Sequence, residues 1–472
     1  MTEPRQIVVK GLTRVEGAGS LRARVTDGRV DIVEFAIYEP PRFFERLLEG
    51  RESREVPDIV ARICGICPVS YQLTACRALE SALGIAVTPE IHLLRRLLAC
   101  GEWIQSHALH IHLLHAPDFL GCDSCFTYPE AYAGFLDRGL RMKAIGGRIV
   151  EVIGGRAVHP VNVAVGGFHR APDAAAIRGL LSDLEWGLHA AADTLHEVSR
   201  FSFPNFTQPY ECVSLRAARG YPMNEGRIVS STATGDAGLD IPIDDYPRHF
   251  VERQVSHSTA LSSFIVPGDR PYLCGPLSRL NNCLAELPSA ARRAADTCGI
   301  GWPSRNPFHA IVARAVEIIA AFEEALAIAR SCRAPVTSCR ISSAARAGAG
   351  CHATEAPRGL LYHRYEIGAD GLVAKATIIP PTSQNQARIE ADLRAYLPSL
   401  LAGGDDQASL GRRDDKASLG RRDDEASLGR RDDEASLGRR DDKASLGCER
   451  LIRSYDPCIS CATHFLTLHI AR

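Results

Sequence analysis

The sequence predicts a mainly helical α+β protein with small β-sheets at its periphery. Three segments place apolar residues at helical spacing, at roughly residues 88–116, 172–200 and 307–331. In the last of these, Ile311, Ala315 and Phe322 belong to one apolar side. Long helices of this kind, with few strand-like segments between them, indicate a core built mostly from packed helices.

The N-terminal forty residues predict a small sheet. The segments QIVVKG, SLRARV and RVDIVEFAIY are rich in β-branched residues, and Asp27-Gly28 between the last two suits a tight hairpin turn. Further along, Pro68 marks the start of a helix that carries an apolar stripe. We expect the glycine-rich segments at 144–160 and 164–170 and the Pro/Gly-rich stretch 264–310 to be loops between the helices.

Composition excludes a general attraction to nucleic acid or to anionic membranes. The 472 residues include 55 basic and 56 acidic side chains, so the net charge is -1, and 45% of the residues are apolar. The N-terminus lacks a basic region followed by an apolar run, and no apolar stretch approaches the ~18 residues of a membrane span. We therefore expect a soluble, cytoplasmic protein with ample material for a core.

A nonapeptide repeat occupies residues 405–447, with units such as DDKASLGRR and DDEASLGRR. Each unit has a single large apolar residue and a glycine, and nine residues are too few for a stacking solenoid unit. We expect a flexible, solvated insertion between a main body, residues 1–404, and a C-terminal metal-binding segment, residues 448–464. A frayed helix with paired charges is the alternative.

Two of the cysteine pairs have the spacing of metal ligands. Sixteen cysteines are scattered along the chain, which favours reduced thiols over a disulfide framework. RICGIC (62–67) and DPCISCATH (456–464) each place two thiols at i and i+3, so that one loop can chelate one ion, and together they predict a four-sulfur site. A structural zinc site is the plainer interpretation. His464 would be a fifth ligand, however, and Asp456 and Arg62 nearby favour a site at which something is protonated. Arg62 and any nearby helix N-terminus would also lower the pKa of the thiols.

These two motifs together resemble the paired signature of the large, catalytic subunit of nickel-iron hydrogenases. The resemblance extends, in family order, to six further motifs and covers nearly the whole chain outside the repeat: TRVEG (13–17), RFFERLLEGR (42–51), HAPDF (115–119), GGRAVHP (154–160), EAPRG (355–359) and IIPPTSQN (378–385). The form of the first motif and the short tail look most like the NAD(P)-linked, sulfhydrogenase branch. The implied fold is a hydrogenase large-subunit helical core, and the implied activity is reversible heterolytic cleavage of H2.

The resemblance implies a role for each matching residue. Nickel would be held by four thiolates, with the second cysteine of each pair also bridging to an iron that carries carbon monoxide and cyanide. Cys458 would accept a proton and pass it to Glu16, under a polar cover that includes Arg358. The implied nickel ligands are Cys64, Cys67, Cys458 and Cys461, and the implied cover is Arg358, Pro357, Asp118 and Asp456.

Further residues are implied to bind the cyanide ligands and a second metal. Thr382 would hydrogen-bond one cyanide, and Glu45, the Ile378 carbonyl and His464 would hold magnesium, or iron, near the C-terminus. Each has an ordinary alternative when taken alone: a turn cap for Thr382, a solvated charge for Glu45, a surface charge for Arg358 and a strand-end salt bridge for Glu16. His159 is as well explained as a hydrogen-bonded core histidine.

The resemblance also implies partners. The chain has no further cysteine quartets for clusters of its own, so electrons would leave through a small subunit with iron-sulfur clusters, and flavin and NAD(P) subunits are implied beyond it. A maturation protease would remove residues 465–472; a retained tail is the alternative. A non-catalytic, zinc-stabilised scaffold of the same fold is the competing function.

Two features depart from the family pattern. Many relatives have a histidine where this chain has Tyr71. Cys122 and Cys125 match no family ligand, so we expect these two to be structural thiols, with adventitious metal binding or a redox disulfide as the alternatives.

Overall fold

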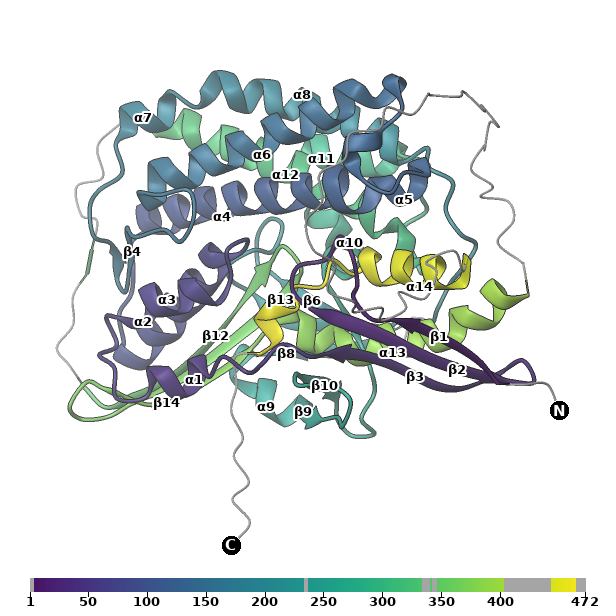
Figure 1. The fold of residues 1–472 in the computed structure, drawn as a ribbon. Coiled ribbons are helices and arrows are strands. Elements are labelled where there is room, and N and C mark those ends of the chain that lie inside the picture. The colour runs from purple at the N-terminus through teal and green to yellow at the C-terminus, as the bar shows by residue number, and fades with distance from the viewer. Residues whose placement is uncertain (1–3, 233–236, 333–339, 342–345, 403–442, 464–472) are drawn as a thin grey trace, which may run out of the picture.

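The computed structural model describes residues 4–232, 237–332, 340–341, 346–402 and 443–463 (Figure 1). Long helices stack in the upper half of the view, and most of the strands lie below them. The long helices are α4 (Pro89–Leu109), α6 (Ala133–Gly154), α8 (Leu181–Val198) and α12 (Ala310–Ser331). They confirm the helical segments expected at 88–116, 172–200 and 307–331. After α4 the chain continues through a π-helical turn, His110–His115, into α5 (Ala116–Leu120).

The N-terminal sheet also forms as expected. The strands β1 (Arg5–Val9), β2 (Gly19–Thr26) and β3 (Arg29–Ile37) pair antiparallel in the order β1-β2-β3. The β2-β3 turn is Asp27-Gly28, and both residues have positive φ, 49° and 76°, as a tight hairpin of this kind requires.

The remaining strands form four small sheets. The strands β12 (Gly348–Ala356), β13 (Gly359–Ile367) and β14 (Val373–Ile379) form an antiparallel meander. A four-stranded sheet has the order β11-β6-β7-β8, and two further pairs are β10-β9 and β4-β5. These strands are β4 (Val163–Ala164), β5 (Gly167–Phe168), β6 (Cys212–Arg216), β7 (Arg227–Ser231), β8 (Ala237–Ile241), β9 (Phe250–Gln254), β10 (Leu261–Ile265) and β11 (Leu273–Cys274).

The remaining helices connect these layers, and one of them is as long as α4. They are α1 (Phe44–Leu48), α2 (Val56–Val60), α3 (Pro68–Leu83), α7 (Ala174–Arg178), α9 (Tyr246–His249), α10 (Pro276–Cys283), α11 (Ser289–Thr297), α13 (Pro381–Leu401) and α14 (Lys443–Ser454). Helix α3 begins at Pro68, where the sequence predicted a helix start. Among the described residues, no helix is both long and apolar enough to cross a membrane.

Two loop predictions were wrong. Residues 144–154 belong to α6, because their glycines allow two helices to approach: a Cβ on Gly146 would lie 2.6 Å from the Gly101 carbonyl oxygen on α4. Glycine here serves helix packing rather than a turn. The stretch 264–310 contains α10 and α11, since Pro276 occupies the first turn of a helix, where its missing N–H costs nothing.

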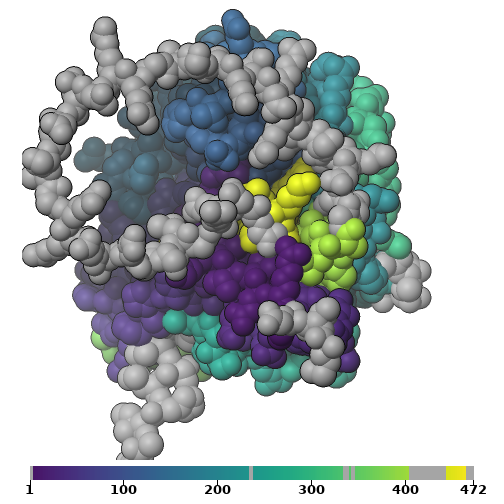
Figure 2. Space-filling view, turned by 45° about the vertical axis from the view of Figure 1, so that its right-hand side comes forward, coloured from purple at the N-terminus to yellow at the C-terminus, as the bar shows by residue number. Residues whose placement is uncertain are grey.

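The C-terminal segment lies between the N-terminal sheet and the helical layer, visible in yellow in Figure 2. It places α14 beside α13 and close to β1. Most of the nonapeptide repeat lies outside the described residues, so its predicted flexibility stays a prediction. Its end, Lys443–Gly447, starts α14, and Ala444 is buried there. His464 and residues 465–472 also lie outside the described residues.

Candidate metal centre

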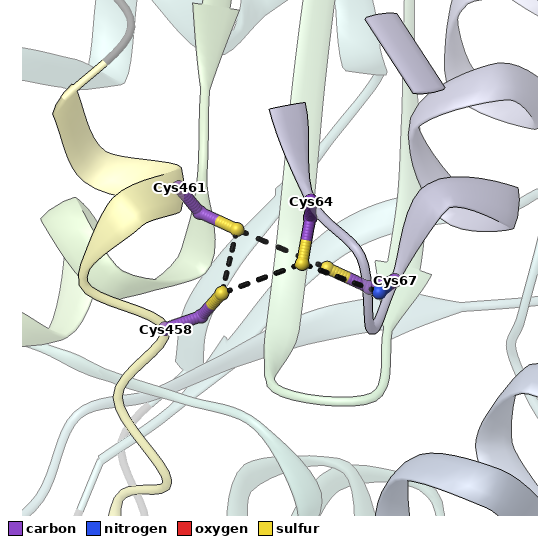
Figure 3. Close-up of side chains that lie close together, drawn as sticks. All are labelled: Cys64, Cys67, Cys458 and Cys461. Carbon is purple, nitrogen blue, oxygen red and sulfur yellow. Dashed lines mark hydrogen bonds between the residues drawn. The ribbon is translucent and has the colours of Figure 1, made fainter. Parts of the chain in front are cut away.

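Four cysteine sulfurs meet in the interior of the protein (Figure 3). Cys64 lies in the extended segment before α3, and Cys67 is the residue from which α3 starts. Cys458 and Cys461 lie in the turn that follows α14. The sulfurs all lie within 4.8 Å of one another, which confirms the prediction that the two pairs, far apart in sequence, form one site.

The two motifs face each other cysteine by cysteine. The first cysteines, Cys64 and Cys458, have sulfurs 3.5 Å apart, and the second cysteines, Cys67 and Cys461, have sulfurs 3.9 Å apart. Thiolates bind a single transition-metal ion at about 2.3 Å, so sulfurs up to about 4.6 Å apart can share one. The donor set therefore fits a soft, thiolate-binding metal such as nickel.

Hydrogen bonds among the buried sulfurs shift the pKa values of Cys64 and Cys458 in opposite directions. All four cysteines are at most 4% exposed. Hydrogen bonds from Cys458, Cys461 and Cys67 hold the pKa of the Cys64 thiol well below its usual value, whereas burial, with the neighbouring sulfurs, raises the pKa of Cys458 well above it. In the absence of metal, Cys64 is therefore the first of these two to ionise and Cys458 keeps its proton.

Glu16 contacts the second motif directly. A parallel β-bridge pairs Glu16 with Cys458, and the Ile459 N–H donates to the Glu16 carbonyl at 2.9 Å. The Glu16 Oε2 atom accepts from the Cys458 thiol and from the Ser460 N–H, both at 3.1 Å. The carboxylate is thereby oriented toward one particular sulfur.

Arg358 covers the site from the β12-β13 hairpin. It is 3% exposed, its Nε donates to the Asp456 carbonyl at 2.9 Å, and its Nη2 donates to the Asp456 carboxylate at 3.1 Å. Burial alone would lower the pKa of Arg358, but Asp456 and the sulfurs raise it well above its usual value, so the guanidinium stays charged. Its Nη1 and the Asp456 Oδ2 are buried without a hydrogen-bond partner among the described residues. A buried polar atom of this kind costs about 1–3 kcal/mol unless it is satisfied. The pair therefore suits a polar group bound at the sulfurs.

Other predicted residues take different places. Asp118 is ion-paired with Arg14 and Arg453 at 2.5 and 2.7 Å, and within the described part of the chain no hydrogen bond joins it to Arg358. The Thr382 hydroxyl accepts from the Cys458 N–H at 3.0 Å, so it holds the metal loop. The prediction that Arg62 lowers the pKa of the thiols was wrong, because its side chain is 43% exposed and pairs with Asp58. Arg358 supplies that positive charge instead.

The region predicted to hold magnesium contains an acid that the sequence did not indicate. Glu45 accepts from the Ile378 N–H at 2.7 Å, and burial raises the pKa of its carboxyl to about 7. Burial likewise raises the pKa of Glu252 on β9 to about 8, with a further contribution from the charge of Glu45. Glu252 stands in an ordinary strand, where no local signal distinguishes it.

Arg42 and His159 support the cysteine loops. The Arg42 guanidinium donates to the Ile63 carbonyl at 2.8 Å and also to the Ser460 carbonyl, so it ties the two loops together. His159 Nδ1 lies 2.7 Å from the Ala61 carbonyl oxygen, which agrees with the expected role of a hydrogen-bonded histidine.

Tyr71 is buried beside the site, and burial, with the charge of the sulfurs, raises the pKa of its phenol well above the usual value. The Cys122 and Cys125 thiols form no disulfide.

Comparisons with known proteins agree with this site. A family described as nickel-dependent hydrogenase matches residues 42–138. Sulfhydrogenase 1 subunit alpha from Pyrococcus furiosus is 28% identical over 98% of both chains, and sulfhydrogenase 2 subunit alpha from the same organism is 29% identical over 97% of this chain and 98% of its own. A solved NAD+-reducing [NiFe]-hydrogenase in the H2-reduced state superposes with a TM-score of 0.80 at 26% identity, covering 98% of this chain and 99% of that one.

The fold and the four-thiol centre together define a metal-dependent oxidoreductase. More particularly, the chain has the fold of a [NiFe]-hydrogenase subunit and is similar, along nearly its whole length, to the alpha subunits of sulfhydrogenases.

Proposed function

We propose that this chain is the catalytic subunit that cleaves H2 heterolytically and reversibly into two protons and two electrons. The observation that carries the proposal is the Cys458-Glu16 contact at 3.1 Å, beside four sulfurs that can share a metal. A nickel ion held by the four cysteines, with an iron carrying carbon monoxide and cyanide bridged by Cys67 and Cys461, would supply the redox capacity and Lewis acidity that split dihydrogen.

The protein's own residues then move the proton. The Cys458 sulfur accepts the proton from dihydrogen, and the Glu16 carboxylate, within hydrogen-bond reach, receives it next. The Ser460 N–H keeps Glu16 oriented during this transfer. The metals would supply the acceptor for the two electrons on their way to a partner, and the second proton would leave by the same Cys458–Glu16 route.

Five further residues are proposed to surround the metal ligands, four of them closely and one at a distance. They are Arg358, Pro357, Asp456, Thr382 and, at a distance, Asp118. Arg358 cannot carry protons at neutral pH, so it stabilises negative charge and positions the polar ligands of the iron, while Asp456 orients it. Thr382 already accepts from Cys458 and keeps its own hydroxyl proton to donate. Asp118 contributes at a distance, through Arg453 and Arg14.

A second metal and several partners complete the proposal. Glu45, the Ile378 carbonyl and His464 would hold magnesium, with Glu252 close to Glu45. A small subunit with iron-sulfur clusters would receive the electrons, and subunits with flavin would pass them to NAD(P). A maturation protease would cut after His464. The cytoplasmic location expected from the sequence belongs to the same proposal.

The test uses the complex co-expressed with its small subunit and maturation proteins. We expect nickel and iron on elemental analysis, infrared bands of metal-bound carbon monoxide and cyanide, and H2-dependent dye reduction. Zinc at the four cysteines, without those bands, would instead identify a non-catalytic scaffold.

A further inference from the structure

The tip of the β12-β13 hairpin carries Arg358. Ala356 pairs with Gly359, so Pro357 and Arg358 are the two residues of the turn. The turn brings the Arg358 side chain to Asp456 and toward the sulfurs. A guanidinium at the end of a hairpin can be aimed accurately only if the tip itself is held.

Arg279 on α10 holds that tip. It is 0% exposed and donates to the Ala356 carbonyl at 3.0 Å and to the Pro357 carbonyl at 2.9 Å. The same side chain donates through Nε and Nη2 to Glu317, both at 2.7 Å, and through Nη1 to Glu355 at 2.9 Å. All five N–H groups of the guanidinium are therefore used.

The groups around Arg279 are themselves fixed. Glu317 on α12 also accepts from the Tyr221 hydroxyl at 2.8 Å, and His107 Nε2 lies 2.9 Å from its other oxygen. Burial alone would raise the pKa of Glu317, but Arg279 lowers it to about 2, so the carboxylate is ionised. Trp103 on α4 lies under the Arg279 guanidinium at 4.4 Å and donates to the Glu355 carbonyl at 3.0 Å. Helices α4, α10 and α12, which are far apart in the sequence, thus each contribute a side chain to the contacts around the hairpin tip.

The two residues that precede α10, Cys274 and Gly275, also touch the tip. A Cβ on Gly275 would lie 2.9 Å from the Arg358 carbonyl oxygen, and one on Gly359 would lie 2.7 Å from the Cys274 sulfur. The two backbones are in direct contact, so a movement of α10 moves the turn.

We propose that Arg279 is a positioning residue that holds the Glu355–Arg358 turn and thereby aims the Arg358 guanidinium at the four cysteine sulfurs. The proposal rests on the proposed function, in which Arg358 covers the metal centre. Lysine cannot replace arginine here. A single ammonium group cannot bond both oxygens of the Glu317 carboxylate and, at the same time, the two carbonyls of the hairpin tip.

The test compares Arg279→Lys with Arg95→Lys in the complex with its small subunit. Arg95 is an equally buried arginine, 2% exposed, that pairs with Glu80 through two bonds and does not touch the hairpin. We expect both variants to retain nickel. Arg279→Lys should lower kcat for H2 oxidation by about 100-fold, shift the infrared bands of the iron ligands and speed amide hydrogen exchange of the 355–359 peptide. Arg95→Lys should change none of these three measurements.

Combination with Arg358→Lys decides whether Arg279 acts through Arg358. The Arg279→Lys change should cause little further loss when Arg358 is already replaced. An undiminished loss in that background, or equal losses in Arg279→Lys and Arg95→Lys, would overturn the inference.

A second variant covers the case in which Arg279→Lys does not fold. Gly275→Ala, at a φ of 120°, pushes the tip without touching the buried charges, and Gly299→Ala, at a φ of 79° and with nothing within 4 Å of its Cβ, is its control. Gly275→Ala should show the same loss and the same dependence on Arg358. An unmodified complex without hydrogenase activity would contradict the proposed function, whereas unchanged exchange and activity in Gly275→Ala would contradict only the role of the α10 contact.

Discussion

The Cys458 thiol lies 3.1 Å from the Glu16 carboxylate, although 442 positions separate the two residues. The contact is reinforced by a backbone bridge between the same residues. A sulfur that can lose a proton and an oxygen that can take it are thus held together by main chain as well as side chain. We expect the chemistry of this site to depend on that pair.

Glu16→Gln should lower H2-dependent dye reduction by about 10²–10⁴-fold, because a carboxamide cannot accept the proton. Nickel content should stay unchanged, since Glu16 is not a metal ligand in the proposal. Glu39→Gln is the matched control, because Glu39 accepts from Ser460 in the same loop and contacts no cysteine sulfur. A Glu16→Gln variant as active as the control would refute the proton-transfer role.

Replacement of any one of the four site cysteines by serine should remove nickel from the purified complex, measured by elemental analysis. Each sulfur is one of the four donors found among the described residues, and a hydroxyl is a poor ligand for a soft metal. Cys122→Ser should retain nickel, because Cys122 donates to the Leu120 carbonyl, outside the site. Nickel retained in Cys64→Ser would argue against a four-thiolate centre.

Glu102 predicts a pH dependence of stability. It accepts from the Val69 and Ser70 N–H groups at the start of α3, and burial raises the pKa of its carboxyl to about 8 from 4.5. Between these two values the folded protein binds more protons than the unfolded chain, so the Glu102 contribution falls as pH rises. Glu102→Gln should therefore flatten the decline of the melting temperature between about pH 5 and pH 8.

Glu323→Gln controls for the loss of a capping carboxylate, because Glu323 accepts from the Ala290 and Ala291 N–H groups at the start of α11 and is only partly buried. Equal melting-temperature slopes in wild type and Glu102→Gln would show that Glu102 does not titrate in this range.

The α4-α6 crossing gives a matched pair of glycines. Gly146→Ala should lower the free energy of unfolding by about 1–3 kcal/mol through overpacking, since its Cβ would meet the Gly101 carbonyl oxygen at 2.6 Å. Gly147→Ala, whose Cβ would lie 3.4 Å from Gln105 Oε1, should be neutral or stabilising by up to about 1 kcal/mol. Denaturant unfolding measures both, and a Gly146→Ala variant as stable as Gly147→Ala would contradict the close packing.

Much of the fold could be predicted from local patterns. Helices α4, α8 and α12 and the first three strands follow from apolar spacing, which depends only on neighbouring residues. The glycines of α6 were misread as loop residues, because a glycine required by a helix crossing looks the same in sequence as one required by a turn. Which of the two it serves depends on what packs against it.

The candidate site likewise has one part that could be predicted from local sequence patterns and one part that could not. The donor set follows from the sequence alone, because the i, i+3 spacing of each cysteine pair is local and thiolates select soft metals. The charges that surround it depend on the fold: Arg358 rather than Arg62 faces the sulfurs, Asp118 pairs with Arg14 and Arg453, and Arg279 holds the hairpin tip. A single charged residue carries no local signal of its partner, because its position depends on the packing of helices and strands that lie far apart in the chain.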